Sequence, residues 1–149
     1  MQMTPDKKKN KLYIVVPCYN EEQVLGETSK RLKIKCENLI QKGQISKDSK
    51  IVFVDDGSKD RTWKMISELH ETDSLFSGVK LSRNRGHQNA LLAGLTMASE
   101  HADMAISMDA DLQDDINAVD QMIEKYYEGC DIVYGVRSAR ETEIGRAHV

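Results

Sequence analysis

The 149-residue sequence lacks several features that would assign it to a common class of protein. Its three cysteines, Cys18, Cys36 and Cys130, have the spacing of neither a disulfide framework nor a zinc site, so we expect buried thiols in a reducing compartment. The formal net charge of −3 gives no general attraction for nucleic acid. No run of about 18 apolar residues predicts a membrane span, and the polar N-terminus does not predict a secretory signal.

Apolar residues make up 40% of the chain, enough for the core of about one domain. Short apolar, β-branched segments alternate with segments whose apolar residues recur at helical spacing. Strands are predicted at residues 11–17, 50–54, 78–81, 103–108 and 131–136, and helices at 24–42, 62–71, 88–99 and 116–127. This order predicts an α/β fold, a mostly parallel sheet with helices on both faces.

The predicted sheet divides the chain into three parts. Residues 1–10 form a polar tail and residues 11–140 the domain, which is C-terminally truncated because the sheet ends soon after its fifth strand. The closing letters EIGRAHV resemble a translated sequencing adapter. We therefore expect residues 141–149 to be a non-native or disordered tail.

Polar residues follow the strands, and ligands of open parallel sheets bind at the carboxyl ends of strands. After the first strand, Tyr19 could stack on a base and Glu21 could accept a hydrogen bond from a sugar or base. The alternative is an ordinary helix start with acidic residues in its first turn. Asn20 with Gln23 resembles a capping box for that helix.

The second strand ends in two adjacent carboxylates, Asp55 and Asp56. Their repulsion requires a cation or hydrogen-bond donors nearby. Asp56 is placed to accept hydrogen bonds from a ring N–H or a ribose. A turn at Gly57 and a helix cap by Ser58 or Asp60 account for the residues that follow.

Basic residues follow the third and fifth strands. Arg83, Arg85 and His87 precede a predicted helix, where they either meet a phosphate or belong to a solvated loop. Arg137 either contacts a diphosphate or is an exposed charge.

The fourth strand leads into the acidic stretch ISMDADLQDD, residues 106–115. Asp109 and Asp111 point the same way in an extended backbone and suit Mg²⁺ or Mn²⁺, with Gln113 as a third oxygen ligand. Asp114 or Asp115 is expected to be the N-cap of the next helix. An isolated D-x-D motif is common by chance.

These motifs together resemble glycosyltransferase family 2, and most of all its polyprenyl-phosphate branch. They are PCYNE at 17–21, VDDGSKDRT at 54–62, SRNRGHQNALLAG at 82–94, MDADLQD at 108–114 and EGCDIVYGVR at 128–137. The resemblance covers about residues 11–140. A Pro-Pro pair is frequent in this branch after the acidic motif, and residues 114–116 depart from that pattern.

The resemblance implies a GT-A fold and an inverting transferase with a nucleotide-diphosphate sugar donor, UDP favoured, and a lipid-phosphate acceptor. It implies nucleotide contacts by Pro17, Tyr19, Glu21, Val54 and Asp56. It assigns the diphosphate to Asp109, Ala110, Asp111 and Arg137, and Mg²⁺ or Mn²⁺ to Asp109, Asp111 and Gln113. The first and third residues of the D-x-D motif would then be catalytic, since their metal stabilises the leaving diphosphate.

For the full-length protein, the resemblance implies the cytoplasmic face of the cell membrane, reached through C-terminal segments that this chain lacks. It leaves a homo-oligomer open and predicts no nucleic-acid partner. Two alternatives remain. One is a phosphoryl-transfer or receiver-like domain that binds Mg²⁺, which would need a lysine where Arg137 stands; the other is an inactive nucleotide-binding fragment.

Overall fold

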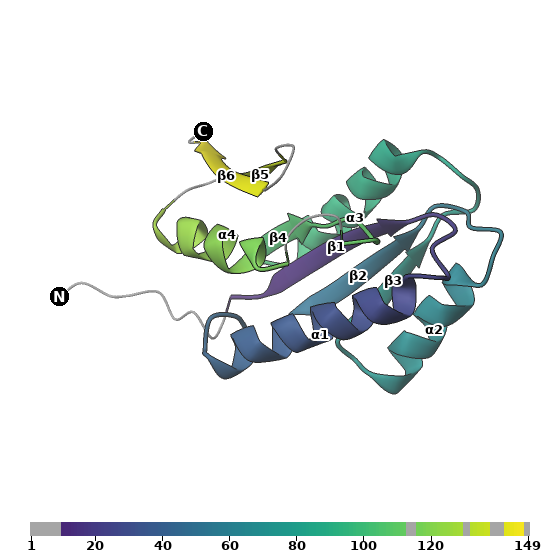
Figure 1. Ribbon diagram of the computed structural model, residues 1–149, viewed down its shortest axis with the longest axis horizontal. Coiled ribbons are helices and arrows are strands. Elements are labelled where there is room, and N and C mark those ends of the chain that lie inside the picture. Colours follow the sequence, from purple (N-terminus) through teal and green to yellow (C-terminus); the bar gives the residue numbers. More distant parts are fainter. Residues whose placement is uncertain (1–9, 113–115, 130–131, 138–141, 148–149) are drawn as a thin grey trace. The chain divides into compact units, whose positions relative to one another are not determined.

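A computed structural model of the chain describes residues 10–112, 116–129, 132–137 and 142–147 (Figure 1). The chain divides into two compact units, Met1–Asp111 and Leu112–Val149. Gln113, Asp114 and Asp115, for which the sequence predicts a metal ligand and a helix cap, lie outside the described residues.

The first unit is built on a four-stranded parallel sheet in the order β3-β2-β1-β4. The strands are β1 (Leu12–Cys18), β2 (Lys50–Asp55), β3 (Phe76–Lys80) and β4 (Met104–Ser107). All seven residues of β1 are buried, since this strand pairs with β2 on one side and β4 on the other. Central position explains why its sequence is continuously apolar rather than alternating.

Helices cover both faces of this sheet, as the sequence predicts: α1 (Leu25–Gln41) and α2 (Thr62–Thr72) lie on one face and α3 (His87–His101) on the other (Figure 1). The small residues of α3 allow it to approach the strands closely. A Cβ at Gly94 would lie 2.3 Å from Val15 Cγ1 and 2.9 Å from Val54 Cγ2. Ala90 and Ala98, one helical turn away on either side, are buried in the same cluster.

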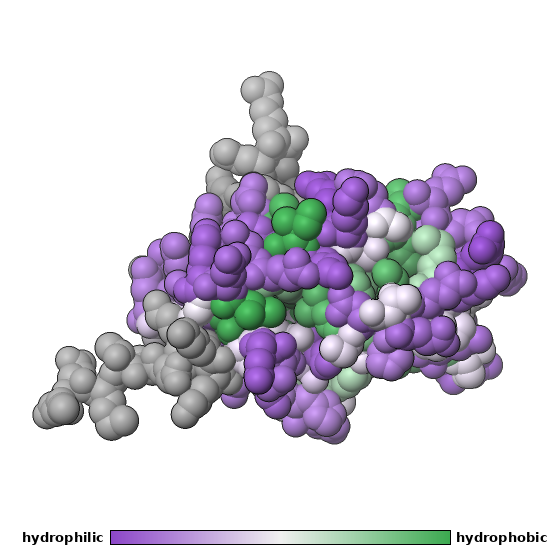
Figure 2. Space-filling model, turned by 90° about the horizontal axis from the view of Figure 1, so that it is seen from below, coloured by the Kyte–Doolittle hydropathy of each residue, from purple (hydrophilic) through white to green (hydrophobic). Residues whose placement is uncertain are grey.

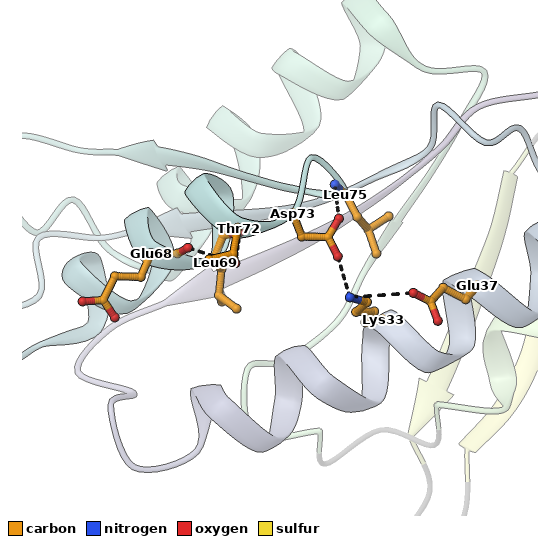
Figure 3. Close-up of polar contacts among 7 residues, drawn as sticks. All are labelled: Lys33, Glu37, Glu68, Leu69, Thr72, Asp73 and Leu75. Carbon is orange, nitrogen blue, oxygen red and sulfur yellow. Dashed lines mark hydrogen bonds and ion pairs between the residues drawn. The ribbon is translucent and has the colours of Figure 1, made fainter.

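An ion pair links α1 to the turn between α2 and β3 (Figure 3). Lys33 Nζ lies 2.7 Å from Asp73 Oδ2, and Asp73 Oδ1 accepts the Leu75 N–H at 3.0 Å. The hydrogen bond from Lys33, and then the Leu75 N–H, hold the pKa of Asp73 below its usual value. One oxygen of the Asp73 carboxylate therefore stabilises the turn, and the other holds this turn against α1.

The second unit contains α4 (Ala118–Tyr127) and a two-stranded antiparallel sheet of β5 (Ile132–Arg137) and β6 (Thr142–Ala147). The fifth predicted strand therefore forms, but its described partner is β6 rather than the parallel sheet. An apolar run predicts a strand without specifying its partner, and a connection of a few residues favours an antiparallel hairpin. β6 covers most of the segment expected to be a non-native or disordered tail, and that expectation stays a prediction.

The fourth helix begins later than the sequence predicts. Asn117 occupies the N-cap position of α4 and makes no side-chain capping bond. The helix thus begins two residues after the predicted start near Ile116, and Asp114 and Asp115, the predicted N-cap residues, lie outside the described residues. Acidic residues before an apolar periodic segment mark a helix start only to within a few residues.

The face seen from below the view of Figure 1 is mostly polar, with apolar side chains exposed among the polar ones around its centre (Figure 2). Ile34 and Leu92 are the most exposed large apolar side chains of the described part of the chain, at 60% and 62%. No helix in that part is both long and apolar enough to cross a membrane.

Candidate functional site

The parallel sheet brings the loops that follow its strands to one edge. The loop after β1 runs from Tyr19 to Val24, and the loop after β2 runs from Asp56 to Arg61. The acidic motif follows β4 at the same edge, because β4 pairs with β1 in parallel register. The Met108 N–H continues this pairing by donating to Val15 O at 3.0 Å.

Hydrogen bonds join the first two loops along their length. The Asn20 N–H donates to Ser58 Oγ at 2.9 Å, and the Lys59 N–H donates back to Asn20 Oδ1 at 2.8 Å. The Glu21 N–H donates to Thr62 Oγ1 at 2.9 Å. These bonds use backbone N–H groups that strand pairing leaves without a partner.

A second set of bonds continues this junction beyond Glu21. The Glu22 N–H donates to Asp60 Oδ2 at 3.2 Å, and the Arg61 N–H donates to Glu22 Oε2 at 3.3 Å. Asp60 Oδ1 also accepts the Thr62 N–H at 2.9 Å. Arg61, however, occupies the N-cap position of α2 without a side-chain capping bond, so the predicted cap by Ser58 or Asp60 is wrong. The two loops therefore form one hydrogen-bonded layer over the sheet edge.

The predicted capping box at Asn20 and Gln23 is wrong. Val24 occupies the N-cap position of α1 and makes no side-chain capping bond. Asn20 has a φ of 52°, in the left-handed region, and its Oδ1 accepts the Lys59 N–H instead. The sequence pattern cannot distinguish a local cap from a contact with a residue 39 positions away.

The adjacent carboxylates at the end of β2, Asp55 and Asp56, are both buried, and backbone donors stabilise them. Asp55 Oδ1 accepts the Ser58 N–H at 3.3 Å, while Asp55 Oδ2 is buried without a hydrogen-bond partner in the described part of the chain. Asp56 accepts the Arg85 N–H at 2.7 Å and the Gly86 N–H at 3.1 Å. This burial disfavours a receiver-like role, because neither carboxylate is exposed to a phosphoryl donor.

The acidic motif after β4 is attached to α1. The buried hydroxyl of Thr28 donates a hydrogen bond to the Ala110 carbonyl. Ala110 is buried, Asp109 is partly exposed and Asp111 is exposed. The small residue thus anchors the motif and leaves its two carboxylates toward solvent. Leu112 follows with a φ of 50°, one of two positive φ values among the described non-glycine residues.

Negative charge gathers where the first loop meets this motif. Burial raises the pKa of the Glu21 carboxyl, and the charges of Asp111, Asp60 and Asp109 raise it further. No three acidic, histidine or cysteine side chains among the described residues are grouped to hold a metal by themselves. A divalent cation still fits the donor set, because Mg²⁺ and Mn²⁺ take one or two carboxylates and complete their shell with phosphate and water.

An open cavity of about 340 Å³ borders the junction of the two loops. Its lining is polar and consists of Asn20, Glu21, Glu22, Gln23, Val24 and Asp60. Tyr19, 41% exposed, directly precedes this segment. The cavity therefore offers carboxylates and amide groups, with an aromatic ring adjacent in the chain.

Other predicted site residues lie in or near the sheet. Pro17 and Val54 are register partners in β1 and β2, and the Val54 side chain packs against α3 in the core. A ligand contact at Val54 would therefore have to use its backbone. Arg83 and Arg85 are exposed, and the alternatives of phosphate binding and a solvated loop both remain. Arg137 ends β5 in the second unit, and its side chain lies outside the described residues.

Two residues of this site carry no recognisable sequence signal. Thr28 reads as one member of the apolar stripe of α1, yet its hydroxyl holds the acidic motif. Thr62 reads as the first residue of α2, yet it anchors Glu21. Both contacts join segments distant in the chain, which periodicity cannot report.

Comparison with known proteins agrees with this geometry. The family described as Glycosyl transferase family 2 matches residues 13–149. An uncharacterized glycosyltransferase of Bacillus subtilis, YkoT, is 54% identical over 89% of this chain and 39% of its own length. An undecaprenyl-phosphate 4-deoxy-4-formamido-L-arabinose transferase of an Enterobacter species is 36% identical over 93% of this chain and 40% of its own. The chain thus spans about two fifths of these relatives.

Two solved structures share the fold. TarS of S. aureus, in complex with UDP-GlcNAc, matches with a TM-score of 0.56 and 20% identity over 78% of this chain and 32% of its own. The mannosyltransferase PcManGT of Pyrobaculum calidifontis, in complex with GDP-Man and Mn²⁺, matches with a TM-score of 0.54 and 23% identity. This match covers 73% of this chain and 30% of the mannosyltransferase chain. The parallel sheet with helices on both faces is thus the GT-A arrangement predicted from the sequence, and this chain belongs to glycosyltransferase family 2.

Proposed function

We propose that this chain binds the donor substrate of an inverting glycosyltransferase, a nucleotide-diphosphate sugar with UDP favoured, together with Mg²⁺ or Mn²⁺. One observation carries the proposal. The carboxylates of Glu21, Asp109 and Asp111 gather at the carboxyl edge of the sheet, where burial, and then the charges of Asp111, Asp60 and Asp109, raise the pKa of Glu21. A divalent cation would relieve this repulsion.

Each residue has a role consistent with its geometry. Asp109 and Asp111 would hold the metal, with Gln113 as a predicted further ligand, and Ala110 would contact the diphosphate. When bound, the metal would supply Lewis-acid stabilisation of the leaving diphosphate. Tyr19 is exposed enough to stack on a base.

The remaining predicted donor contacts need finer assignment. Pro17 and Val54 would contact the nucleotide at the sheet edge. Arg137 would contact the donor phosphates. The Asp56 carboxylate already accepts two backbone N–H groups, so a nucleotide would use one of its remaining lone pairs. We therefore propose that Asp56 shapes the site through these two backbone bonds and also contacts the nucleotide directly.

The acceptor we propose for the full-length protein is a polyprenyl phosphate. The Enterobacter relative supports this assignment, since its name is undecaprenyl-phosphate 4-deoxy-4-formamido-L-arabinose transferase. A lipid phosphate is already anionic and requires no strong general base. The proposed location is the cytoplasmic face of the cell membrane, where a nucleotide sugar and a lipid acceptor meet; homo-oligomerisation stays a prediction.

Donor binding is tested by calorimetric titration of the chain with UDP and GDP, with and without Mn²⁺. We expect affinity for one of the two to rise on addition of Mn²⁺, and the gain to disappear in Asp111→Ala. The matched control is Asp48→Ala, which removes an exposed carboxylate just before β2, at the opposite edge of the sheet. Equal affinity with and without Mn²⁺ would rule out the metal role.

The acceptor is tested separately on the full-length protein, with a radiolabelled nucleotide sugar and either undecaprenyl phosphate or a soluble sugar acceptor. Transfer of label to the lipid phosphate alone is the expected result. Transfer to the soluble acceptor alone would leave donor binding intact and overturn the proposed acceptor.

A further inference from the structure

We propose that Asn20 is a positioning residue of the donor site, which holds Tyr19 and Glu21 in place by joining the loop after β1 to the loop after β2. This inference rests on the proposed function. Asn20 both donates to and accepts from the second loop, through its N–H to Ser58 Oγ at 2.9 Å and through its Oδ1 from the Lys59 N–H at 2.8 Å.

The backbone conformation explains why asparagine suits this position. A φ of 52° is unfavourable for most residues, and asparagine, aspartate and glycine tolerate it best. Among these three, only asparagine and aspartate also offer a side-chain oxygen to the Lys59 N–H. Residues held in this region cluster at functional sites when the surrounding structure fixes them, as two hydrogen bonds do here.

The consequence reaches the two neighbours of Asn20 in the chain. Tyr19 on one side is the exposed aromatic residue of the site, and Glu21 on the other lines the cavity. A change of φ and ψ at Asn20 would turn the planes of both flanking peptides and so move both side chains. Thr62 fixes the Glu21 N–H independently, so the loss of Asn20 should displace Tyr19 more than Glu21.

Three variants separate the contributions of Asn20. Asn20→Gly keeps the backbone conformation and removes the oxygen that binds Lys59. Asn20→Asp keeps both the backbone conformation and the side-chain oxygen, and is the conservative rescue variant. Ser58→Ala removes the acceptor of the Asn20 N–H without changing any residue of the cavity lining.

The measurement is the dissociation constant for UMP and for UDP, with and without Mn²⁺, using the guanine nucleotides if the wild-type chain prefers them. Loss of a hydrogen bond of about 1 kcal/mol corresponds to about fivefold, so we expect Asn20→Gly and Ser58→Ala each to weaken UMP binding by about fivefold or more. Asn20→Asp should bind UMP more tightly than Asn20→Gly, but less tightly than the wild type, because it restores the oxygen while adding a carboxylate beside Glu21 and Asp60. The gain in UDP affinity on adding Mn²⁺ should be unchanged, since the acidic motif is not altered.

The outcomes distinguish this inference from the proposed function. If the wild-type chain binds neither UDP nor GDP at about 1 mM, the upper end of ordinary substrate affinities, the proposed function fails and the inference fails with it. If the wild type binds and Asn20→Gly binds UMP equally well, only the inference is overturned. Asn20→Gly and Ser58→Ala combined should weaken binding by less than the product of their separate effects, because both act through one loop junction. A fully multiplicative effect would contradict this coupling.

Discussion

The carboxylate of Asp56 accepts the backbone N–H of Arg85, with 2.7 Å between Oδ1 and nitrogen, and so ties the end of β2 to the loop that precedes α3. Its other oxygen accepts the Gly86 N–H at 3.1 Å. The side chain is only 4% exposed, so these two donors replace the water that a carboxylate would otherwise bind. A residue that reads from the sequence as a ligand contact is thus also a structural clamp.

Replacing Asp56 by asparagine should lower the free energy of unfolding by about 1.5–3 kcal/mol, the usual contribution of hydrogen bonds to a charged group. The amide has one oxygen, and its NH₂ group would face the second N–H donor. Urea denaturation of the variant and the wild type measures the difference. A change below about 0.5 kcal/mol, typical of surface substitutions, would show that the clamp contributes little.

Gly57→Ala should destabilise the protein, whereas Gly26→Ala should not. Gly57 has a φ of 74°, and a Cβ there would lie 2.4 Å from the backbone nitrogen of Asn84. Strain of about 1–2 kcal/mol from the left-handed backbone adds to that clash. Gly26 lies in the first turn of α1 with no atom within 4 Å of an added Cβ, so alanine there should be neutral or stabilising by up to about 1 kcal/mol. Equal melting temperatures for the two variants would contradict this account.

The sequence predicts the frame of the first unit well, because buried parallel strands are continuous apolar runs and helices are periodic. The predicted strand at 50–54 and the observed β2 differ by one residue. The alternation of these elements was enough to predict the parallel sheet and its ligand-binding edge. Strand partners are harder to predict, because nothing in the apolar segment at 131–136 indicates that β5 pairs with β6.

The site could be predicted by residue type but not by contact. The sequence shows that Asp55 and Asp56 need donors, and the structure supplies them from backbone N–H groups of two different loops. The sequence pattern predicts a local cap at Asn20, whereas its side-chain oxygen accepts the Lys59 N–H. Such long-range pairs depend on the folded arrangement of loops, which a single sequence does not encode in any simple spacing.

Glu21→Gln should raise stability at neutral pH. The pKa of Glu21 is raised in the folded state, so its folded-state contribution is most favourable below its unfolded pKa and is lost as the pH rises through the folded pKa. At pH 7 the carboxylate is charged and repelled by Asp111, Asp60 and Asp109, and glutamine removes this repulsion. At about pH 4 and below, where glutamate is largely protonated in the unfolded chain, the two proteins should have similar melting temperatures.

Two controls accompany the Glu21 experiment. Glu27→Gln removes an exposed carboxylate from the first turn of α1, where negative charge is favourable, and should not raise the melting temperature at pH 7. Addition of Mn²⁺ should stabilise the wild type more than Glu21→Gln if the cation relieves the same repulsion. A Glu21→Gln variant less stable than the wild type at pH 7 would contradict the charge argument.

The thiols of Cys18 and Cys36 should resist alkylation in the native protein. Burial raises the pKa of Cys18 well above its usual value, and the charges of Glu21 and Asp55 raise it further. Burial and then Glu37 raise the pKa of Cys36 to about 12. The thiolate, which is the reactive form, is therefore scarce at pH 8.

Mass spectrometry after brief treatment with iodoacetamide at pH 8 measures this protection. We expect peptides that contain Cys18 or Cys36 to be unmodified in the native protein and fully modified in urea. Rapid native labelling of Cys18 would show that the end of β1 opens far more readily than its burial indicates.

The most direct test of the donor site is a crystal structure of the chain with UDP and Mn²⁺, in which anomalous scattering locates the metal. The account predicts a manganese peak in contact with carboxylate oxygens of Asp109 and Asp111 and with oxygens of the diphosphate, and the base beside Tyr19. A nucleotide bound at this edge with the metal elsewhere, or with no metal at all, would contradict it.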